Sequence, residues 1–195
     1  MFQISGILTI LLVFGFCSEV VSITSQKKYP HPIFIPFEQN CTGNYKGKKP
    51  SNKAILQIRE AHSKWLKNPT ASARANLCEA DLGGEVLNKA MLAGANFAKA
   101  KLQNARLEQA NLTRANFSEA QLQGANLDNA MLHLAILQKA MLDNASLQNA
   151  MLYQTNLQGA DLSHVNGLTQ YQINMACMDQ HTKLPPGLSR PKPCS

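Results

Sequence analysis

The sequence predicts an all-β solenoid, in which one short unit is repeated along a coiled backbone. Residues 75–164 divide into eighteen consecutive five-residue units without an insertion or a deletion. A leucine or phenylalanine stands at the centre of every unit, and an alanine precedes it by two positions except at Glu85 and Thr155. A short fixed period is typical of repeat architectures whose units stack on one another.

A five-residue period fits neither of the regular elements. On an α-helix, at ~100° per residue, successive central residues would spread around the whole cylinder. On a flat strand, an odd period would send them to alternating faces. The pattern is consistent only with a backbone that turns at every unit, so that the central residues all point to a common axis. The expected core therefore includes Leu77, Leu82, Phe97, Phe117 and Leu122.

Like residues recur at intervals of twenty, which suggests four units per coil. Phe97 and Phe117 lie twenty residues apart, and Met91, Met131 and Met151 are separated by multiples of twenty, although Met141 is not. Eighteen units then make about four and a half coils, or roughly 20 Å of stacked backbone at the sheet spacing of ~4.8 Å.

Units such as Ala110-Asn111-Leu112-Thr113-Arg114 and Ala125-Asn126-Leu127-Asp128-Asn129 resemble the pentapeptide-repeat family. The resemblance implies a right-handed quadrilateral β-helix, and it covers about half of the chain. The family implies protein interaction more than any one activity. Some members are acidic, cytoplasmic DNA mimics that bind DNA gyrase, but the charge of this coil and the leader described next disfavour that alternative.

The segments before the coil read as a leader, an arm and a cap. Residues 1–22, whose apolar run is too short to cross a membrane, predict a signal peptide and therefore export to the periplasm or beyond the cell. Residues 23–50 predict a basic, flexible arm, which could alternatively bind an anionic polymer or a membrane surface. Residues 51–74 predict a capping helix that begins at Ser51 and ends at Pro69, with His62 packed rather than binding a ligand.

Residues 165–195 predict a C-terminal cap, with a short helix that begins at Thr169 and an extended tail after it. Such a segment would shield the open backbone edge of the last coil.

Charge follows the same division, because residues 75–164 hold six basic and eight acidic side chains, whereas residues 23–74 hold ten basic and two acidic side chains. The basicity therefore belongs to the flanks.

Four cysteines remain after the predicted cleavage: Cys41, Cys78, Cys177 and Cys194. An even number of cysteines in an exported chain indicates disulfides, and four cysteines allow three pairings. Proximity along the chain favours Cys177 with Cys194, which leaves Cys41 for Cys78.

One stretch of the coil departs from the polar pattern expected of outward positions. Between residues 131 and 153 these positions turn apolar, and the candidate interface comprises Met131, Leu134, Ile136, Met141, Met151 and Tyr153. A contiguous exposed apolar patch marks an interface on a soluble protein. The patch predicts either a protein partner or homodimer surface, or a surface that the C-terminal tail folds back to cover.

Neither a catalytic site nor a cofactor site is predicted. The five histidines have no metal-ligand spacing, and the sequence has no CxxC, no GxSxG and no phosphate-binding glycine loop. A buried Glu85 would need a partner, so distortion or solvent access is expected there in the first coil. The sequence thus predicts a non-enzymatic exported protein that acts as a binding or scaffold module.

Overall fold

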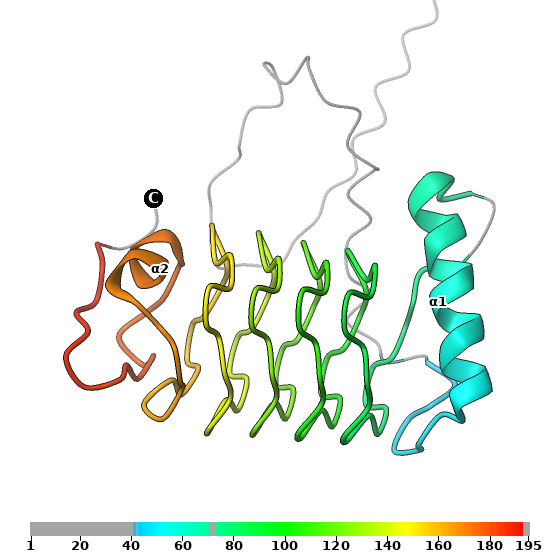
Figure 1. Cartoon of the computed structure of the whole chain (residues 1–195), viewed down its shortest axis with the longest axis horizontal. Coiled ribbons are helices and arrows are strands. Elements are labelled where there is room, and N and C mark those ends of the chain that lie inside the picture. The colour runs from blue at the N-terminus through cyan, green and yellow to red at the C-terminus, as the bar shows by residue number, and fades with distance from the viewer. Residues whose placement is uncertain (1–40, 42, 71–72, 193–195) are drawn as a thin grey trace, which may run out of the picture. The chain divides into compact units, whose positions relative to one another are not determined.

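The computed structural model describes residues 41, 43–70 and 73–192. All of them belong to one compact unit. The predicted signal peptide and most of the predicted arm lie outside the described residues. Two helices flank the coil, α1 (Asn52–Lys67) before it and α2 (Gln170–Met175) after it (Figure 1).

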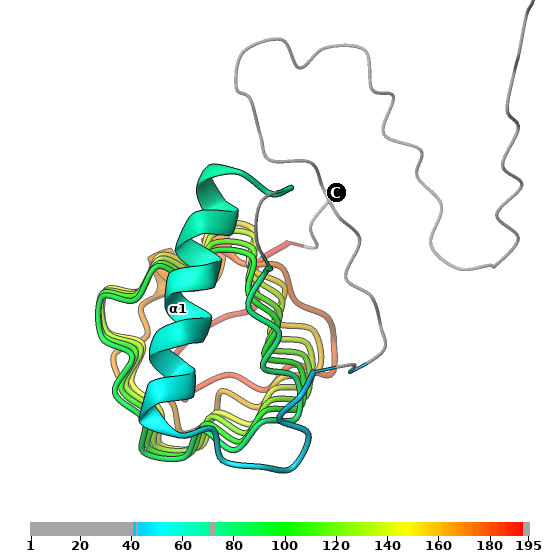
Figure 2. The same ribbon diagram turned by 90° about the vertical axis from the view of Figure 1, so that its right-hand side faces the viewer.

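The coil closes once every four units. Parallel backbone bridges join residues twenty apart, from Asn76 and Asn96 to Ser146 and Asn166. At each bridge the hydrogen bonds alternate, as where Leu77 N–H donates to Asn96 O at 2.7 Å and Asn96 N–H donates to Ala75 O at 2.9 Å. The expectation of four units per coil is therefore confirmed, and Figure 2 shows the four sides in projection.

Each unit turns a corner through a tight turn. Ala80 N–H donates back to Leu77 O at 3.1 Å, and the residue before the alanine adopts a positive φ, such as 57° at Glu79 and 58° at Leu134. This left-handed conformation favours glycine and asparagine. The corner positions are rich in both, as at Gly94 and Asn104.

The interior is filled by buried apolar side chains. Central residues from Leu82 to Leu147 are at most 2% exposed. Leu77 is 3% exposed, and the rings of Phe97 and Phe117 stack with their centroids 4.8 Å apart and an interplanar angle of 3°. The expected core residues therefore all point inward.

Helix α1 lies across the N-terminal end of the coil (Figure 2). The Ser51 side chain accepts a hydrogen bond from Ala54 N–H and caps the helix. Ile55, His62 and Trp65 are its buried residues. The Trp65 ring comes within 3.5 Å of the position that a Cβ on Gly94 would take, so glycine at that corner leaves room for it.

At the C-terminal end the chain continues the coil with longer units. Asn156 bridges to Cys177 and Asp161 to Lys183, which are 21 and 22 residues apart rather than twenty. Helix α2, held by a capping box between Thr169 and Gln172, takes up the extra length. No helix in the described ranges is long and apolar enough to span a membrane.

Glu85 does not distort the first coil. Its carbonyl accepts Arg106 N–H at 2.9 Å, as the regular ladder requires. The side chain keeps 15% exposure and pairs with Lys49 at 3.3 Å. Solvent access and a cationic partner together account for a carboxylate at a position where other units place alanine.

Candidate functional site

One side of the coil carries most of the predicted interface. We call this side the methionine face; it comprises the outward positions of the four units 90–94, 110–114, 130–134 and 150–154. The coil register places Met131 directly beside Met151, with a parallel bridge between them, and the same ladder begins at Met91. The twenty-residue spacing in the sequence therefore becomes a column of three methionines, interrupted by Asn111.

Large side chains on this face are open to solvent. Met151 is 49% exposed, Tyr153 is 52% exposed and Leu134 is 37% exposed. The rings of His133 and Tyr153 meet edge to face, with centroids 6.4 Å apart. Met131 is half-buried. Together these residues form a continuous apolar and aromatic surface over two neighbouring coils.

The surface extends past a corner and along the axis. Ile136 is half-buried on the adjoining side and bridges to Asn156. At the other end of the column, Gln154 N–H donates to Met175 O at 2.7 Å, so α2 continues the face where a further coil would lie. Met175 itself is 36% exposed.

Met141 does not belong to this surface. It bridges to Gln121 and Asp161, so it lies in the column opposite the methionine face, and Gln123 Nε2 contacts its sulfur at 3.6 Å. The grouping of Met141 with the other five interface candidates is wrong for a physical reason: its position, ten residues from Met131, is half a coil away.

The tail does not cover the methionine face. Residues 165–192 pass over the end of the coil, where Leu168, Leu184 and Leu188 pack against the core. Met151 and Tyr153 keep about half of their surface exposed. Within the described part of the chain, the reading in which the tail folds back over the patch is contradicted.

The methionine face is also almost without charge. Arg114 is the one Lys, Arg, Asp or Glu among its twelve outward positions. The opposite side, by contrast, carries an ion pair between Lys183 and Asp161 at 2.7 Å. Hydrogen bonds from Lys183 and Ser163 lower the pKa of Asp161 to about 2. An uncharged apolar surface can be buried against a partner without leaving an unpaired charge.

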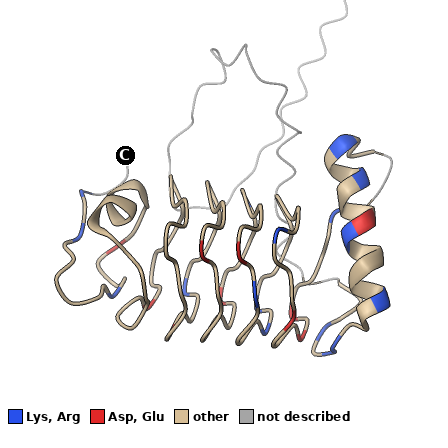
Figure 3. Ribbon diagram, viewed as in Figure 1, with Lys and Arg blue, Asp and Glu red and all other residues tan. Residues whose placement is uncertain are grey.

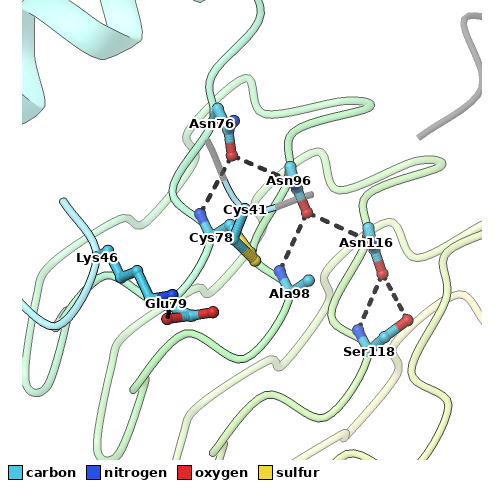
Figure 4. Close-up of a disulfide and its surroundings, with 9 residues drawn as sticks. All are labelled: Cys41, Lys46, Asn76, Cys78, Glu79, Asn96, Ala98, Asn116 and Ser118. Carbon is cyan, nitrogen blue, oxygen red and sulfur yellow. Dashed lines mark hydrogen bonds and ion pairs between the residues drawn. A yellow bond between two sulfur atoms is a disulfide. The ribbon is translucent and has the colours of Figure 1, made fainter. Parts of the chain in front are cut away.

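A second constellation lies at the first coil, where a disulfide joins Cys41 to Cys78 with their Cα atoms 5.3 Å apart (Figure 4). This is the pairing that remains once Cys177 is assigned to Cys194. Cys177 is also disulfide-bonded. Cys194 lies outside the described residues, so that pairing stays a prediction.

Downstream of the disulfide, residues 43–50 form a strap along the edge of the first coil. Gly47 N–H donates to Glu79 O at 2.8 Å, and Asp81 N–H donates to Lys48 O at 3.0 Å. Lys46 and Lys49 form ion pairs with Glu79 and Glu85 at 3.4 and 3.3 Å. Part of the basic arm is therefore held against acidic positions of the coil.

Basic side chains gather on α1, as Figure 3 shows. Lys53, Lys64 and Lys67 are exposed there, and Glu60 is the helix's one acidic residue. His62, by contrast, is fully buried: it accepts from Ala75 N–H at Nδ1 and donates from Nε2 to Ala93 O, both at 3.0 Å. It serves the packing of the cap, where its ring stacks on Trp65.

The described residues contain one group with metal-ligating chemistry. The ligand atoms of Cys41, Cys78 and Glu79 all lie within 4.8 Å of one another. Sequence reasoning missed this group because Cys41 and Cys78 are 37 positions apart. The spacing of a metal motif is local, whereas here a coil edge brings the ligands together.

Comparison with known proteins agrees with the architecture. A family model for pentapeptide repeats matches eight copies, over residues 73–109, 100–138, 110–149 and 132–166. No curated protein matches the chain.

Three of the similar solved structures come from proteins with different settings. A pentapeptide repeat protein from the thylakoid lumen of Arabidopsis thaliana is 26% identical, with 54% of this chain and 79% of that chain covered and a TM-score of 0.35. HetL of the cyanobacterium Nostoc, involved in heterocyst differentiation regulation, is 28% identical, with 58% and 59% covered and a TM-score of 0.31. QnrB1, a plasmid-mediated fluoroquinolone resistance protein, is 18% identical, with 59% and 65% covered and a TM-score of 0.33.

These partial alignments assign the chain no activity. The eight matched repeats, together with a backbone that closes every twenty residues, do assign its architecture. Residues 73–166 therefore belong to the pentapeptide-repeat family, and their coil is the right-handed quadrilateral β-helix that such repeats form.

Proposed function

We propose that this chain is a non-enzymatic binding module that docks a protein partner on its methionine face. The observation that carries the proposal is the exposure of Met151, Tyr153 and Leu134 on one side with a single charged position. Flat, uncharged and aromatic surfaces of this kind are typical of the central part of protein interfaces. Methionine adapts its shape to the surface it meets.

The coil supplies a rigid platform for such an interface. Its interior is filled by its own side chains, and the outward positions are fixed by a ladder on either side. A partner therefore meets a surface that is already ordered, which lowers the entropic cost of binding.

We further propose that the chain works outside the reducing cytoplasm, with residues 1–22 as a removable leader. The Cys41–Cys78 disulfide supports this proposal, because structural disulfides persist in oxidising compartments. We also propose that α1 and the segment after residue 165 act as end caps, which stop the solenoid of one molecule from stacking end to end on that of another. An intact-mass measurement of the native protein, with thiols alkylated before reduction, tests this part. A chain that starts at Ile23 and carries no alkyl group is expected.

A matched pair of substitutions tests the methionine face. Met151→Lys places a charge within the face, whereas Met141→Lys places one on the opposite side at a residue of similar exposure, 40% against 49%. Proteins of the native host that bind the immobilised wild-type chain should no longer bind Met151→Lys but should still bind Met141→Lys. Any self-association of the chain seen by light scattering should respond in the same way. Equal binding by both variants would exclude the methionine face as the interface.

A further inference from the structure

Two sulfur atoms and a carboxylate converge where the strap meets the first coil. Cys41 lies two positions before the first residue of the strap, Cys78 lies just after the centre of the first unit, and Glu79 follows it at the corner (Figure 4). We propose that, when the Cys41–Cys78 disulfide is reduced, these three side chains bind a thiophilic divalent cation such as Zn²⁺, and that closure of the disulfide releases it. This site is separate from the methionine face and does not depend on it.

The donor set is one that Zn²⁺ prefers. Zinc binds cysteine thiolates at about 2.3 Å and carboxylate oxygens at about 2.0–2.2 Å in a tetrahedron, which separates two bound sulfurs by about 3.8 Å. All three ligand atoms lie within 4.8 Å of one another, and the two Cα atoms are 5.3 Å apart. Once the disulfide is open, rotation of the two cysteine side chains brings the sulfurs to that separation.

Two of the three ligands are held in place by the coil. Cys78 N–H donates to Asn76 Oδ1 at 3.4 Å, and the same oxygen accepts Asn96 Nδ2–H at 3.1 Å. The backbone of Glu79 is held by hydrogen bonds on both sides of its Cα. Its N–H donates to Ala98 O at 2.9 Å. Its carbonyl also accepts Gly47 N–H from the strap. Ligands that are oriented before the metal arrives bind it more tightly.

The site is open to solvent at Glu79 and Cys41. Cys78 is 1% exposed, so its sulfur is shielded on the side of the coil. The Glu79 side chain keeps 25% exposure, and Cys41 is half-buried. A cation would enter past these two residues. Three protein ligands leave a fourth position for water, which makes the cation exchangeable rather than essential to the fold.

Lys46 tunes the affinity of this site. Its ammonium lies 3.4 Å from Glu79 and the side chain is 68% exposed, so it can swing into solvent when a cation takes the carboxylate. While it stays, it competes with the cation for Glu79. Removing this positive charge should therefore strengthen binding.

The release step balances as a thiol–disulfide exchange. The thiolates of Cys41 and Cys78 give up two electrons to an external disulfide, form one sulfur–sulfur bond and leave two external thiolates. A sulfur in a disulfide is a poor ligand for Zn²⁺, because the thiolate is the form of cysteine that binds metal. The cation then leaves with only Glu79 to hold it.

Zinc titration of the reduced full-length chain tests the proposal, with a chromophoric chelator as competitor and Co²⁺ as a spectroscopic probe. One equivalent should bind with a thiolate-to-cobalt charge-transfer band. Glu79→Gln should weaken binding at least tenfold, whereas Glu85→Gln, a neighbouring carboxylate with its own lysine partner, should leave it unchanged. Lys46→Ala should tighten binding, and oxidised glutathione should release the ion.

Three results would overturn the proposal. Equal affinity in the wild type and in Glu79→Gln would mean that the carboxylate is not a ligand. Retention of the ion in Cys78→Ser, or loss of the ion in Cys177→Ser, would place the metal at other cysteines. Because Glu79→Gln keeps both cysteines and leaves the coil interior unchanged, its readout remains interpretable even if Cys78→Ser fails to fold.

Discussion

Acidification should loosen the N-terminal cap through a single histidine. Burial, and to a lesser degree the charge of Arg74, lower the pKa of His62 from 6.5 to about 4, despite a hydrogen bond to Ala93 O that acts in the opposite direction. The folded chain holds this ring neutral, because Nδ1 must accept Ala75 N–H. A protonated ring would set two donors against each other.

The sign and size of the effect follow from these values. Because the folded pKa lies below the unfolded one, the unfolded chain binds more protons between pH 6.5 and 4. The stabilisation is fully present above pH 6.5 and is lost as the pH falls to about 4. A shift of this size corresponds to about 3 kcal/mol, at about 1.4 kcal/mol per pH unit, and most of it is gone by pH 4.5.

Guanidinium unfolding followed by tryptophan fluorescence measures this loss. Trp65 is the one tryptophan, and its ring stacks on His62 with centroids 5.2 Å apart, so the signal reports on the cap. His62→Gln can still donate and accept but does not titrate, and its stability should be flat over this window. His133→Gln, a change at a residue outside the cap, should keep the wild-type slope. If the wild type lost nothing between pH 7 and 4.5, or if His62→Gln kept the slope, the reasoning would fail.

Four further substitutions have expected outcomes. Phe117→Ala should lower the free energy of unfolding by about 3–5 kcal/mol, because it opens a cavity and removes the stack on Phe97; an unchanged denaturation midpoint would contradict its burial. Gly167→Ala should cost about 2–4 kcal/mol, since its φ is +76° and the new Cβ would lie 2.8 Å from backbone. Gly84→Ala, with a φ of +70° and open space around it, should cost only about 1 kcal/mol, and equal losses at both glycines would leave φ as the whole cause. Because Lys183 and Ser163 hold the pKa of Asp161 at about 2, Asp161→Asn should flatten the acid unfolding curve below pH 4, where the wild type loses this contribution as the carboxylate protonates.

Periodicity was enough to predict the coil, because a solenoid repeats one local solution. The alanine and leucine positions specify what points inward, and the corner residues specify where the backbone turns. Phe97 and Phe117 also indicated the coil length, because residues that are one coil apart stack on each other inside the solenoid. Their stacking at 4.8 Å is the three-dimensional form of a spacing visible in the sequence.

The candidate interface was predicted less well. Apolar residues close together in the sequence were grouped, although neighbours in this fold are twenty positions apart. Met131 and Met151 meet, whereas Met141 lies between them in sequence and on the opposite side in space. In a helix or a strand, the short residue period itself tells which side chains share a face. In this coil, residues share a face only if they are one whole coil, or twenty positions, apart.

The sequence predicts a helix at each end of the coil but not the side chains that satisfy the end backbone, because a repeat pattern is silent about groups that have no repeat beside them. Every interior coil satisfies its backbone with the coils before and after it, so the two ends must find other partners. At one end His62 takes both an N–H and a carbonyl. At the other, Gln172 Nε2 donates to Leu147 O and Ala150 O, and Thr182 Oγ1 donates to Leu157 O. Each is a buried polar side chain from outside the repeats, and each replaces the backbone of a missing coil.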